Sequence, residues 1–342
     1  MCWPLIVSLC AAQLSPTPTY QHPHGVAQVA GHAYVADTSG GALFQFDIHN
    51  GIVAGSGRII VRGLSMPVGV AVDRQGLVYV SESPYPLHAI DVYRVHGFHA
   101  TLLRKIVFSS AYEPEHLAVD QRGYLYALIN WDAIAWFPPE ANGKPDVPHH
   151  LLQTNGSGLT EIGTDAAGDL FSVDVVSTIF AYDARPGKHV KEKPSREITM
   201  PNQIFANYGD FVTLEGDDLY VGYSGRSCPP GCHWQHVAVV EANSSGPTAP
   251  QRIVTLRHGC PEPPPSLSRR NGSRATAGPD YLPDGFTDVV HGGYLYQPCA
   301  LQMSGHVITG VFTFPAHGNG AVDPLGFAQA PMNSAADIAI GP

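Results

Sequence analysis

The chain has 342 residues, of which 44% are hydrophobic and only 14% are charged. Because globular proteins average roughly a quarter charged residues, this composition excludes a disordered chain and a solvated helical bundle. The 36 glycines and 30 prolines argue against long helices, and a formal net charge of −10 argues against a nucleic-acid-binding surface.

An apolar run of 12 residues, Trp3 to Leu14, precedes the proline-rich stretch at residues 15–19. It is too short for the roughly 30 Å hydrocarbon core of a bilayer, but its length fits the apolar part of a secretory signal. We predict a leader at residues 1–19, a single domain at 20–342, and a secreted, periplasmic or cell-surface location. No later segment is apolar for long enough to cross a membrane, so we do not expect a transmembrane protein.

A motif of two short apolar runs joined by a turn recurs along the chain. Pro67 to Glu82 reads PVGVAVDRQGLVYVSE, and Pro114 to Asn130 reads PEHLAVDQRGYLYALIN. The intervals between the aromatic anchors of the copies are 45, 47, 45, 49 and 76 residues. These anchors are Tyr34, Tyr79, Tyr126, Phe171, Tyr220 and Tyr296.

Each copy predicts antiparallel strands. The first run has the apolar composition of a strand covered on both faces, and an Asp-x-x-Gly turn, as at Asp73 and Asp120, leads into the second strand. A third alternating strand follows, and a more polar fourth strand, as at 104–108 and 252–256, closes most units. Third strands are predicted to begin at Ala42, Ala89, Ala133, Thr178 and His236. Four strands at this period are typical of a propeller blade, so we predict an all-β fold, a six-bladed β-propeller of four-stranded antiparallel blades.

The long last interval and the C-terminus depart from the period. We assign the extra residues to Cys/Pro-rich loop insertions at about 224–235 and 257–282 rather than to a seventh blade. The C-terminal segment Ala335–Pro342, AADIAIGP, repeats the opening of a unit and then stops. It predicts either an inner strand that closes the ring or the start of a truncated blade.

The pattern PVGVAVDRQGLVYV at Pro67–Val80 resembles NHL-type repeats. Those repeats belong to six-bladed propellers, a group that includes gluconolactonase-like lactonases and streptogramin lyases. The segments FPPEANG at 137–143 and FPAHGNG at 314–320 are similar to the FPAGANG turn of exported bacterial propellers of unknown function. The resemblance covers nearly the whole chain from His22 on and implies the propeller fold. Its lactonase members imply Glu, Asn and Asp side chains around a calcium ion.

Four cysteines, Cys228, Cys232, Cys260 and Cys299, lie in the last third of the chain. In an exported protein an even number indicates disulfides. We predict two, in which Cys228 and Cys232 pair with the other cysteines rather than with each other. The alternative is a structural zinc site that also uses Cys260 or His233.

Propeller geometry brings the beginnings of inner strands and the ends of second strands to one face, around the channel mouth. Imidazole and carboxylate groups from separate blades that meet there suit Ca²⁺ or another divalent cation. The predicted ligand or metal residues are His116, Glu161, Asp210, Asp288, Glu82 and Asn130. An aspartate at a strand end is also a common turn cap, and Asp73, Asp120 and Asp165, in hairpins on the opposite face, are predicted to be structural.

Three functions remain open at this point. The first is a secreted binding or scaffold protein that recognises an extracellular protein, a glycan or a small molecule at the channel-mouth face. The second is a divalent-metal-dependent lactonase, other hydrolase or lyase at the same face, in which the metal polarises a carbonyl or activates water. The third is a structural or surface-assembly protein. Analysis of bound metal separates the first two.

Overall fold

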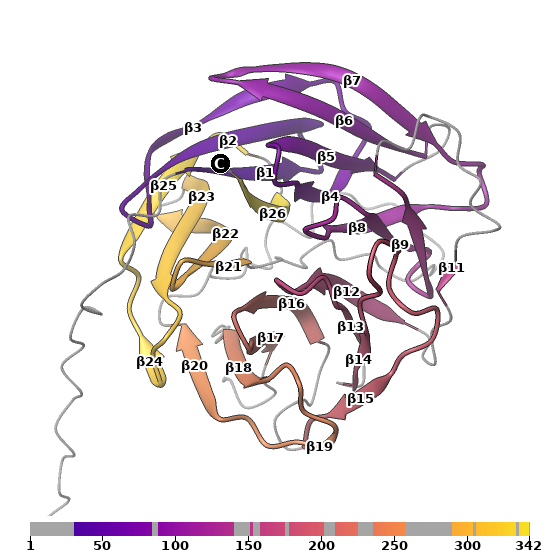
Figure 1. Cartoon of the computed structure of the whole chain (residues 1–342). Coiled ribbons are helices and arrows are strands. Elements are labelled where there is room, and N and C mark those ends of the chain that lie inside the picture. Colours follow the sequence, from indigo (N-terminus) through magenta and orange to yellow (C-terminus); the bar gives the residue numbers. More distant parts are fainter. Residues whose placement is uncertain are drawn as a thin grey trace, which may run out of the picture.

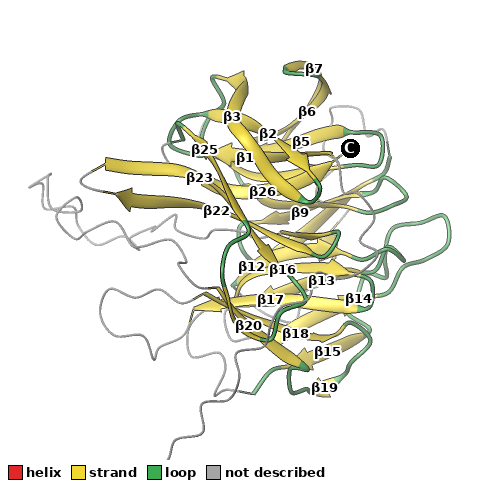
Figure 2. Cartoon of the chain, turned by 90° about the vertical axis from the view of Figure 1, so that its left-hand side faces the viewer, coloured by secondary structure: helices red, strands yellow, loops and turns green. Residues whose placement is uncertain are grey.

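The computed structural model describes residues 31–83, 88–139, 151–152, 158–174, 178–201, 209–224, 235–256, 289–303, 306–332 and 335–341. Throughout this part of the chain the regular elements are β-strands, and Figure 2 shows strands and loops only. Accordingly, none of the described residues belongs to a helix able to span a bilayer. The predicted leader and most of both predicted insertions lie outside the described residues.

The strands form four-stranded sets, here called blades 1 to 6, arranged around a common axis (Figure 1). Blade 1 contains β26 (Ala335–Gly341), β1 (Gly31–Asp37), β2 (Ala42–His49) and β3 (Ile52–Arg62); blade 2 contains β4 (Pro67–Val72), β5 (Leu77–Glu82), β6 (Ala89–His96) and β7 (His99–Val107). Blade 3 contains β8 (Pro114–Val119), β9 (Leu125–Ile129), β10 (Ala133–Phe137) and β11 (Leu151–Leu152).

The other three blades repeat this order, with the first strand of each nearest the axis. Blade 4 contains β12 (Leu159–Thr164), β13 (Leu170–Asp174), β14 (Thr178–Tyr182) and β15 (Arg196–Thr199); blade 5 contains β16 (Gly209–Glu215), β17 (Asp218–Ser224), β18 (Gln235–Glu241) and β20 (Arg252–Leu256). Blade 6 contains β21 (Val289–His291), β22 (Tyr294–Met303), β23 (His306–Pro315) and β25 (Gly326–Ala330). Two short strands, β19 (Gly246–Pro247) and β24 (Gly320–Val322), lie parallel to the outer strands β15 and β20.

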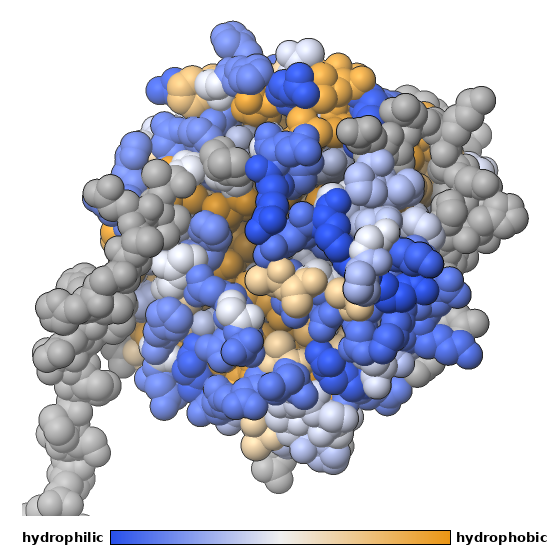
Figure 3. All heavy atoms as spheres, viewed as in Figure 1, coloured by the Kyte–Doolittle hydropathy of each residue, from blue (hydrophilic) through white to orange (hydrophobic). Residues whose placement is uncertain are grey.

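Apolar side chains fill the interfaces between blades that are neighbours in the ring. The described residues form one such core at each of the junctions 1–2, 2–3, 3–4, 4–5, 5–6 and 6–1. At the junction of blades 6 and 1, Phe44 and Tyr296 are 1% and 0% exposed. Burial of a large apolar side chain stabilises the fold by about 1.5–3 kcal/mol, so these cores hold the ring together. The exterior is mostly hydrophilic on the face in Figure 3, with smaller apolar patches.

The two ends of the described chain meet in blade 1. β26 is the innermost strand there, antiparallel to β1, with Tyr34 opposite Ala339 and His32 opposite Gly341. Of the two alternatives predicted for the C-terminal segment, the structure shows the inner strand that closes the ring. The all-β propeller prediction is also confirmed.

The hairpin aspartates have the structural role predicted for them. Asp73 Oδ1 accepts hydrogen bonds from the backbone N–H groups of Gln75 and Leu77, at 2.8 and 2.9 Å. Asp120 Oδ1 makes the equivalent contacts in the next blade, and Asp165 Oδ1 accepts from the N–H of Asp169. Each carboxylate satisfies backbone donors that the tight turn leaves without ladder partners.

Candidate functional site

Four inner strands that follow one another around the ring, β26, β4, β8 and β12, have a β-bulge near the same register position. This position lies two residues before the residue that faces the aromatic anchor of each blade. Its occupants are Asp337, Gly69, His116 and Glu161. A bulge turns a side chain away from the regular pleat and is frequent beside functional sites. Three of the four residues at this register have side chains of metal-ligand types, and the fourth is glycine.

His116, Glu161 and Asp337 meet, although they come from blades 3, 4 and 1. His116 Nδ1 lies 2.8 Å from Glu161 Oε2 and 4.0 Å from Asp337 Oδ2. One ligand atom from each residue lies within 4.8 Å of the other two, a spacing that fits atoms around a single ion. We call these three residues the channel-mouth cluster.

Backbone contacts hold the two carboxylates of the cluster in place. Glu161 Oε1 accepts the N–H of Ile162 at 2.9 Å. Asp337 accepts the N–H of Ile338 on Oδ1 and that of Val70, in the neighbouring blade, on Oδ2, both at 2.7 Å. The carboxylates are therefore fixed before any ligand binds, which reduces the entropy lost on binding.

Gly69 allows the cluster to form across blade 2. A Cβ atom at this position would overlap the carbonyl oxygen of Glu115 and lie 3.0 Å from the Cα of His116. The N–H of Gly69 donates to Ser81 Oγ at 2.7 Å, and that hydroxyl donates to the carbonyl of Glu115 at 2.6 Å. The missing side chain thus lets β4 and β8 approach closely and leaves space for Asp337 and His116 to reach each other.

We expect Gly69→Ala to destabilise the protein by about 1–3 kcal/mol, because the new methyl group must displace backbone rather than a flexible side chain. It should also weaken cation binding, since β4 moves away from β8. Gly246→Ala is the control. Gly246 has a left-handed backbone (φ +71°) but open space around it. This variant should lose about 1–2 kcal/mol of stability and bind the cation as the wild type does. Urea unfolding and metal titration measure both effects. Equal cation affinity in the two variants would contradict this role of Gly69.

Burial and charge change the proton affinities of the cluster. Burial acts to lower the pKa of His116. The charge of Glu161, the hydrogen bond that His116 donates to it, and the charges of Asp337 and Glu115 outweigh this effect and raise the pKa to about 9. Burial and the charge of Glu161 raise the pKa of Asp337 to about 8. Burial and the charge of Glu113 raise the pKa of the adjacent Glu115 to about 8. Without a bound cation the cluster therefore holds protons at pH 7, and a metal must displace the proton from His116.

Two of the predicted residues lie on the same face but have other partners. Glu82 is 4% exposed and bonds Lys105 Nζ through Oε1 at 2.7 Å and the N–H of Ser65 through Oε2 at 2.6 Å. Asn130 Oδ1 accepts the N–H of Glu113 at 2.8 Å, and its Nδ2 donates to the carbonyl of Ala111 at 2.9 Å. Glu82 thus contacts a lysine and a backbone N–H group, and Asn130 contacts two backbone groups. The structure does not bring either side chain into the cluster.

Asn130 has an indirect effect on the site through the next residue. Asn130 and Trp131 both have left-handed backbones, with φ of 52° for the asparagine and 58° for the tryptophan. Such a conformation is costly for a bulky residue. The Trp131 ring meets that of His116 edge to face, with centroids 5.5 Å apart. The strained turn therefore positions an aromatic wall beside the cluster.

The side chains of the remaining predicted residues lie outside the described part of the chain. Asp210 lies in β16, one residue before Phe211, which takes the register position of Glu161 and is fully buried between blades 5 and 6. The side chains of Asp210 and Cys299, and the whole of Asp288, lie outside the described residues, as do Cys228, Cys232 and Cys260. The disulfides therefore stay a prediction.

Asp337 is the member of the cluster that is not among the residues predicted from the sequence. Its segment repeats the opening of a unit, and its register in that unit matches that of His116 and Glu161. Alignment of AADIAIGP with PEHLAVD by their apolar residues places Asp337 opposite His116. That alignment was the available signal.

No family model matches the chain, and no curated protein matches it. Among solved structures, the chain is similar to a protein from Lactobacillus plantarum, with a TM-score of 0.52 and 11% identity over 91% of this chain and 99% of that one. It is also similar to TolB from Acinetobacter baumannii, with a TM-score of 0.52 and 12% identity over 91% of this chain and 66% of that one.

Hydrazine synthase from Kuenenia stuttgartiensis is less similar, with a TM-score of 0.48 and 13% identity over 77% of this chain. The alignment spans 66% of the hydrazine synthase chain, just under two thirds of its length. Identities as low as these show the fold alone. The comparisons therefore agree with the strand topology: the chain is an all-β propeller.

Proposed function

We propose that this protein is an exported, ligand-binding β-propeller of the NHL-like type that holds a divalent cation at the channel mouth. The observation that carries the proposal is the convergence of His116, Glu161 and Asp337 from three blades at one bulged register. A regular repeat places equivalent positions around the axis, but only ligand-type side chains at those positions make a cation site.

The donor set favours particular metals. One imidazole nitrogen and two carboxylate oxygens suit Mn²⁺, Fe²⁺ or Zn²⁺, whereas Ca²⁺ prefers oxygen ligands alone. The side chains of His116, Glu161 and Asp337 are 8%, 3% and 4% exposed, so a cation there exchanges little with solvent. Three protein ligands leave further coordination positions for water or for an oxygen atom of a ligand that binds at the channel mouth.

Metal titration of the whole protein tests this function. After removal of metal by a chelator, we expect one equivalent of Mn²⁺ or Zn²⁺ to bind, measured by calorimetry and elemental analysis, with Ca²⁺ at least tenfold weaker. His116→Ala and Glu161→Gln should each reduce the affinity at least tenfold, because each removes one of three ligands. His291→Ala, at an exposed histidine in β21, is the control and should bind as the wild type does. A wild type that binds no cation, or equal affinity in all variants, would refute the proposal.

A metal-dependent hydrolase or lyase at this face is the second candidate, and one observation favours it. Glu115 is 3% exposed, adjacent to His116, and burial raises its pKa to about 8. A carboxyl group that keeps its proton at neutral pH has the property of a general acid. Turnover of lactones or esters that depends on the added cation would favour this function over binding alone.

A further inference from the structure

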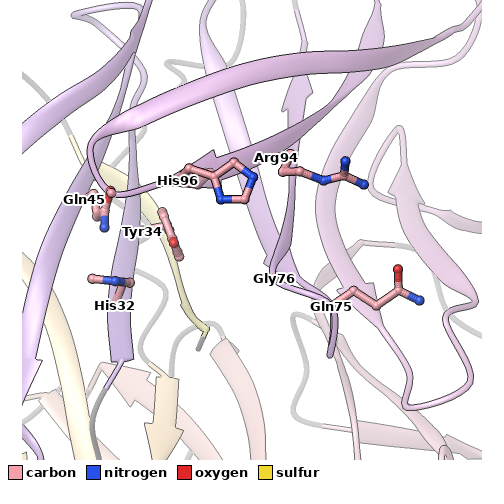
Figure 4. Close-up of a pocket in the computed structure, with 9 residues that line it drawn as sticks. His32, Tyr34, Gln45, Gln75, Gly76, Arg94 and His96 are labelled. Carbon is pink, nitrogen blue, oxygen red and sulfur yellow. The ribbon is translucent and has the colours of Figure 1, made fainter.

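A pocket of about 270 Å³ lies between blades 1 and 2, away from the channel-mouth cluster. His32 and Tyr34 of β1, Gln45 of β2, and Arg94 and His96 of β6 contribute to its lining. Figure 4 shows His32, Tyr34, Gln45 and His96 gathered together, with Arg94 farther along the strand that carries His96. Its volume is just below the roughly 300–1,000 Å³ of sites for drug-sized molecules, so the pocket fits a small molecule.

The pocket lies where ring closure removes a hairpin. In blade 2 the hydroxyl of Tyr79 donates to Asp73, in the turn between the inner and second strands, at 3.1 Å. In blade 1 these two strands come from opposite ends of the chain, so no such turn joins them. In blade 1 the position equivalent to Asp73 is occupied by Gly341. Tyr34 therefore has no turn carboxylate like the one that Tyr79 contacts in blade 2.

Gln45 differs from the residues at the same position in the other blades. It faces Tyr34 across the sheet. The residues opposite the anchors of blades 2, 3, 4 and 5 are Val92, Trp136, Ala181 and Val239. In blade 6 the position holds a polar residue, Thr313, but its hydroxyl accepts the N–H of Val53 at 3.2 Å. Gln45 is only 1% exposed, and among the described residues neither its amide nitrogen nor its amide oxygen has a hydrogen-bond partner. Buried amides in folded proteins are nearly always satisfied by protein, water or a bound molecule. An occupant of the pocket is in position to satisfy this one.

Arg94 gives the pocket a preference for an anion. Arg94 is exposed, and no carboxylate in the described part of the chain pairs with it. His96 lies two residues further along the same strand, and His32 pairs with Asp47 at 3.1 Å. A guanidinium group presents parallel N–H donors that match a carboxylate, while an amide offers both a donor and an acceptor, as hydroxyl groups require.

We propose that this pocket binds a small hydroxy acid, with its carboxylate at Arg94 and its hydroxyl groups at the Gln45 amide and the Tyr34 hydroxyl. The site is independent of the cation proposed at the channel mouth.

Calorimetric titration of the full chain with D-glucuronate tests the proposal. D-Glucose keeps the ring and lacks the carboxylate, and acetate keeps the carboxylate and lacks the hydroxyl groups. We expect glucuronate to bind at least tenfold more tightly than either. Arg94→Gln should reduce glucuronate affinity at least tenfold, and His116→Ala should leave it unchanged. Gln45→Val, which installs the residue type found at Val92 and Val239, should abolish binding while raising the melting temperature.

Three results would overturn the proposal. The first is glucuronate affinity no higher than that of glucose and acetate. The second is wild-type affinity in both Arg94→Gln and Gln45→Val. The third is a crystal structure in glucuronate that shows ordered water alone on the Gln45 amide.

Discussion

Deletion of residues 335–342 is expected to abolish cooperative folding, because it removes the inner strand of blade 1. β26 pairs with β1 from His32 to Asp37, so its loss leaves a row of buried backbone groups without partners. Ile338 belongs to the core between blades 6 and 1, and Ala339 to the core between blades 1 and 2. The loss thus opens both junctions, and its cost is comparable to the whole stability of a typical domain, about 5–15 kcal/mol.

Circular dichroism and gel filtration of the truncated protein check this expectation. Ile338→Ala is the matched point variant; it keeps the strand and should cost about 2–5 kcal/mol through the cavity alone. A synthetic peptide of residues 335–342, added to the truncated protein, should restore part of the melting transition. A truncated protein that melts within a few degrees of the full chain would show that β26 does not hold the ring closed.

The metal-free protein should lose stability as the pH rises from about 5 to about 9. Glu115, His116 and Asp337 all have folded-state pKa values above their unfolded values, at about 8, 9 and 8. The folded state therefore binds protons more tightly than the unfolded state. Glu115 and Asp337 begin to destabilise the fold above about pH 4, where they lose protons in the unfolded state. The stability contributed by protonated His116 is fully present below pH 6.5 and is lost as the pH rises through about 9. A loss of a few kcal/mol is the expected magnitude, given 1.36 kcal/mol for each pKa unit.

Urea unfolding in a chelating buffer at fixed pH values measures this dependence. The side chain of Glu161 also faces His116 and Asp337, and it is kept unchanged in this experiment. Glu115→Gln should flatten the profile between pH 5 and 8, because the glutamine does not titrate. Added Mn²⁺ should stabilise the protein most at high pH, where the cation replaces the proton of His116. A chelated protein that becomes more stable with rising pH would contradict the charge state assigned to the cluster.

The fold could be predicted from the sequence because each blade repeats a local pattern. The anchor Tyr79 and the turn at Asp73 are only six residues apart, so alternation and turn chemistry locate a hairpin without tertiary information. Glu161 and His116 were found for the same reason, since each lies ten residues before its anchor. Asp337 has no anchor after it in the chain, because its partner strand is β1 at the other end.

Blade 5 departs from the ten-residue spacing between an inner-strand residue and its anchor. In blade 5 the pair Glu215 and Asp218 encloses a shorter turn than the Asp-x-x-Gly turns do, so counting ten residues back from Tyr220 overshoots by one and misses Phe211. Glu82 has a partner on a different strand: its Oε1 lies 2.7 Å from Lys105 Nζ, on the outer strand β7. The spacing of the repeats along the sequence does not predict contacts that occur in one blade only.

The C-terminal position of the innermost strand of blade 1 also sets the order in which the ribosome can supply the parts of the ring. Blades 2 to 6 each arise from one continuous stretch of chain and contain their own inner strands. Strands β1 to β3 are made early and then wait for roughly 300 further residues, which takes about 15–60 s at ordinary rates of synthesis. During that time the edge of β1 is unpaired, and unpaired edges are sites of aggregation. A chaperone that binds nascent chains therefore has its longest-lived target in residues 31–62 of this protein.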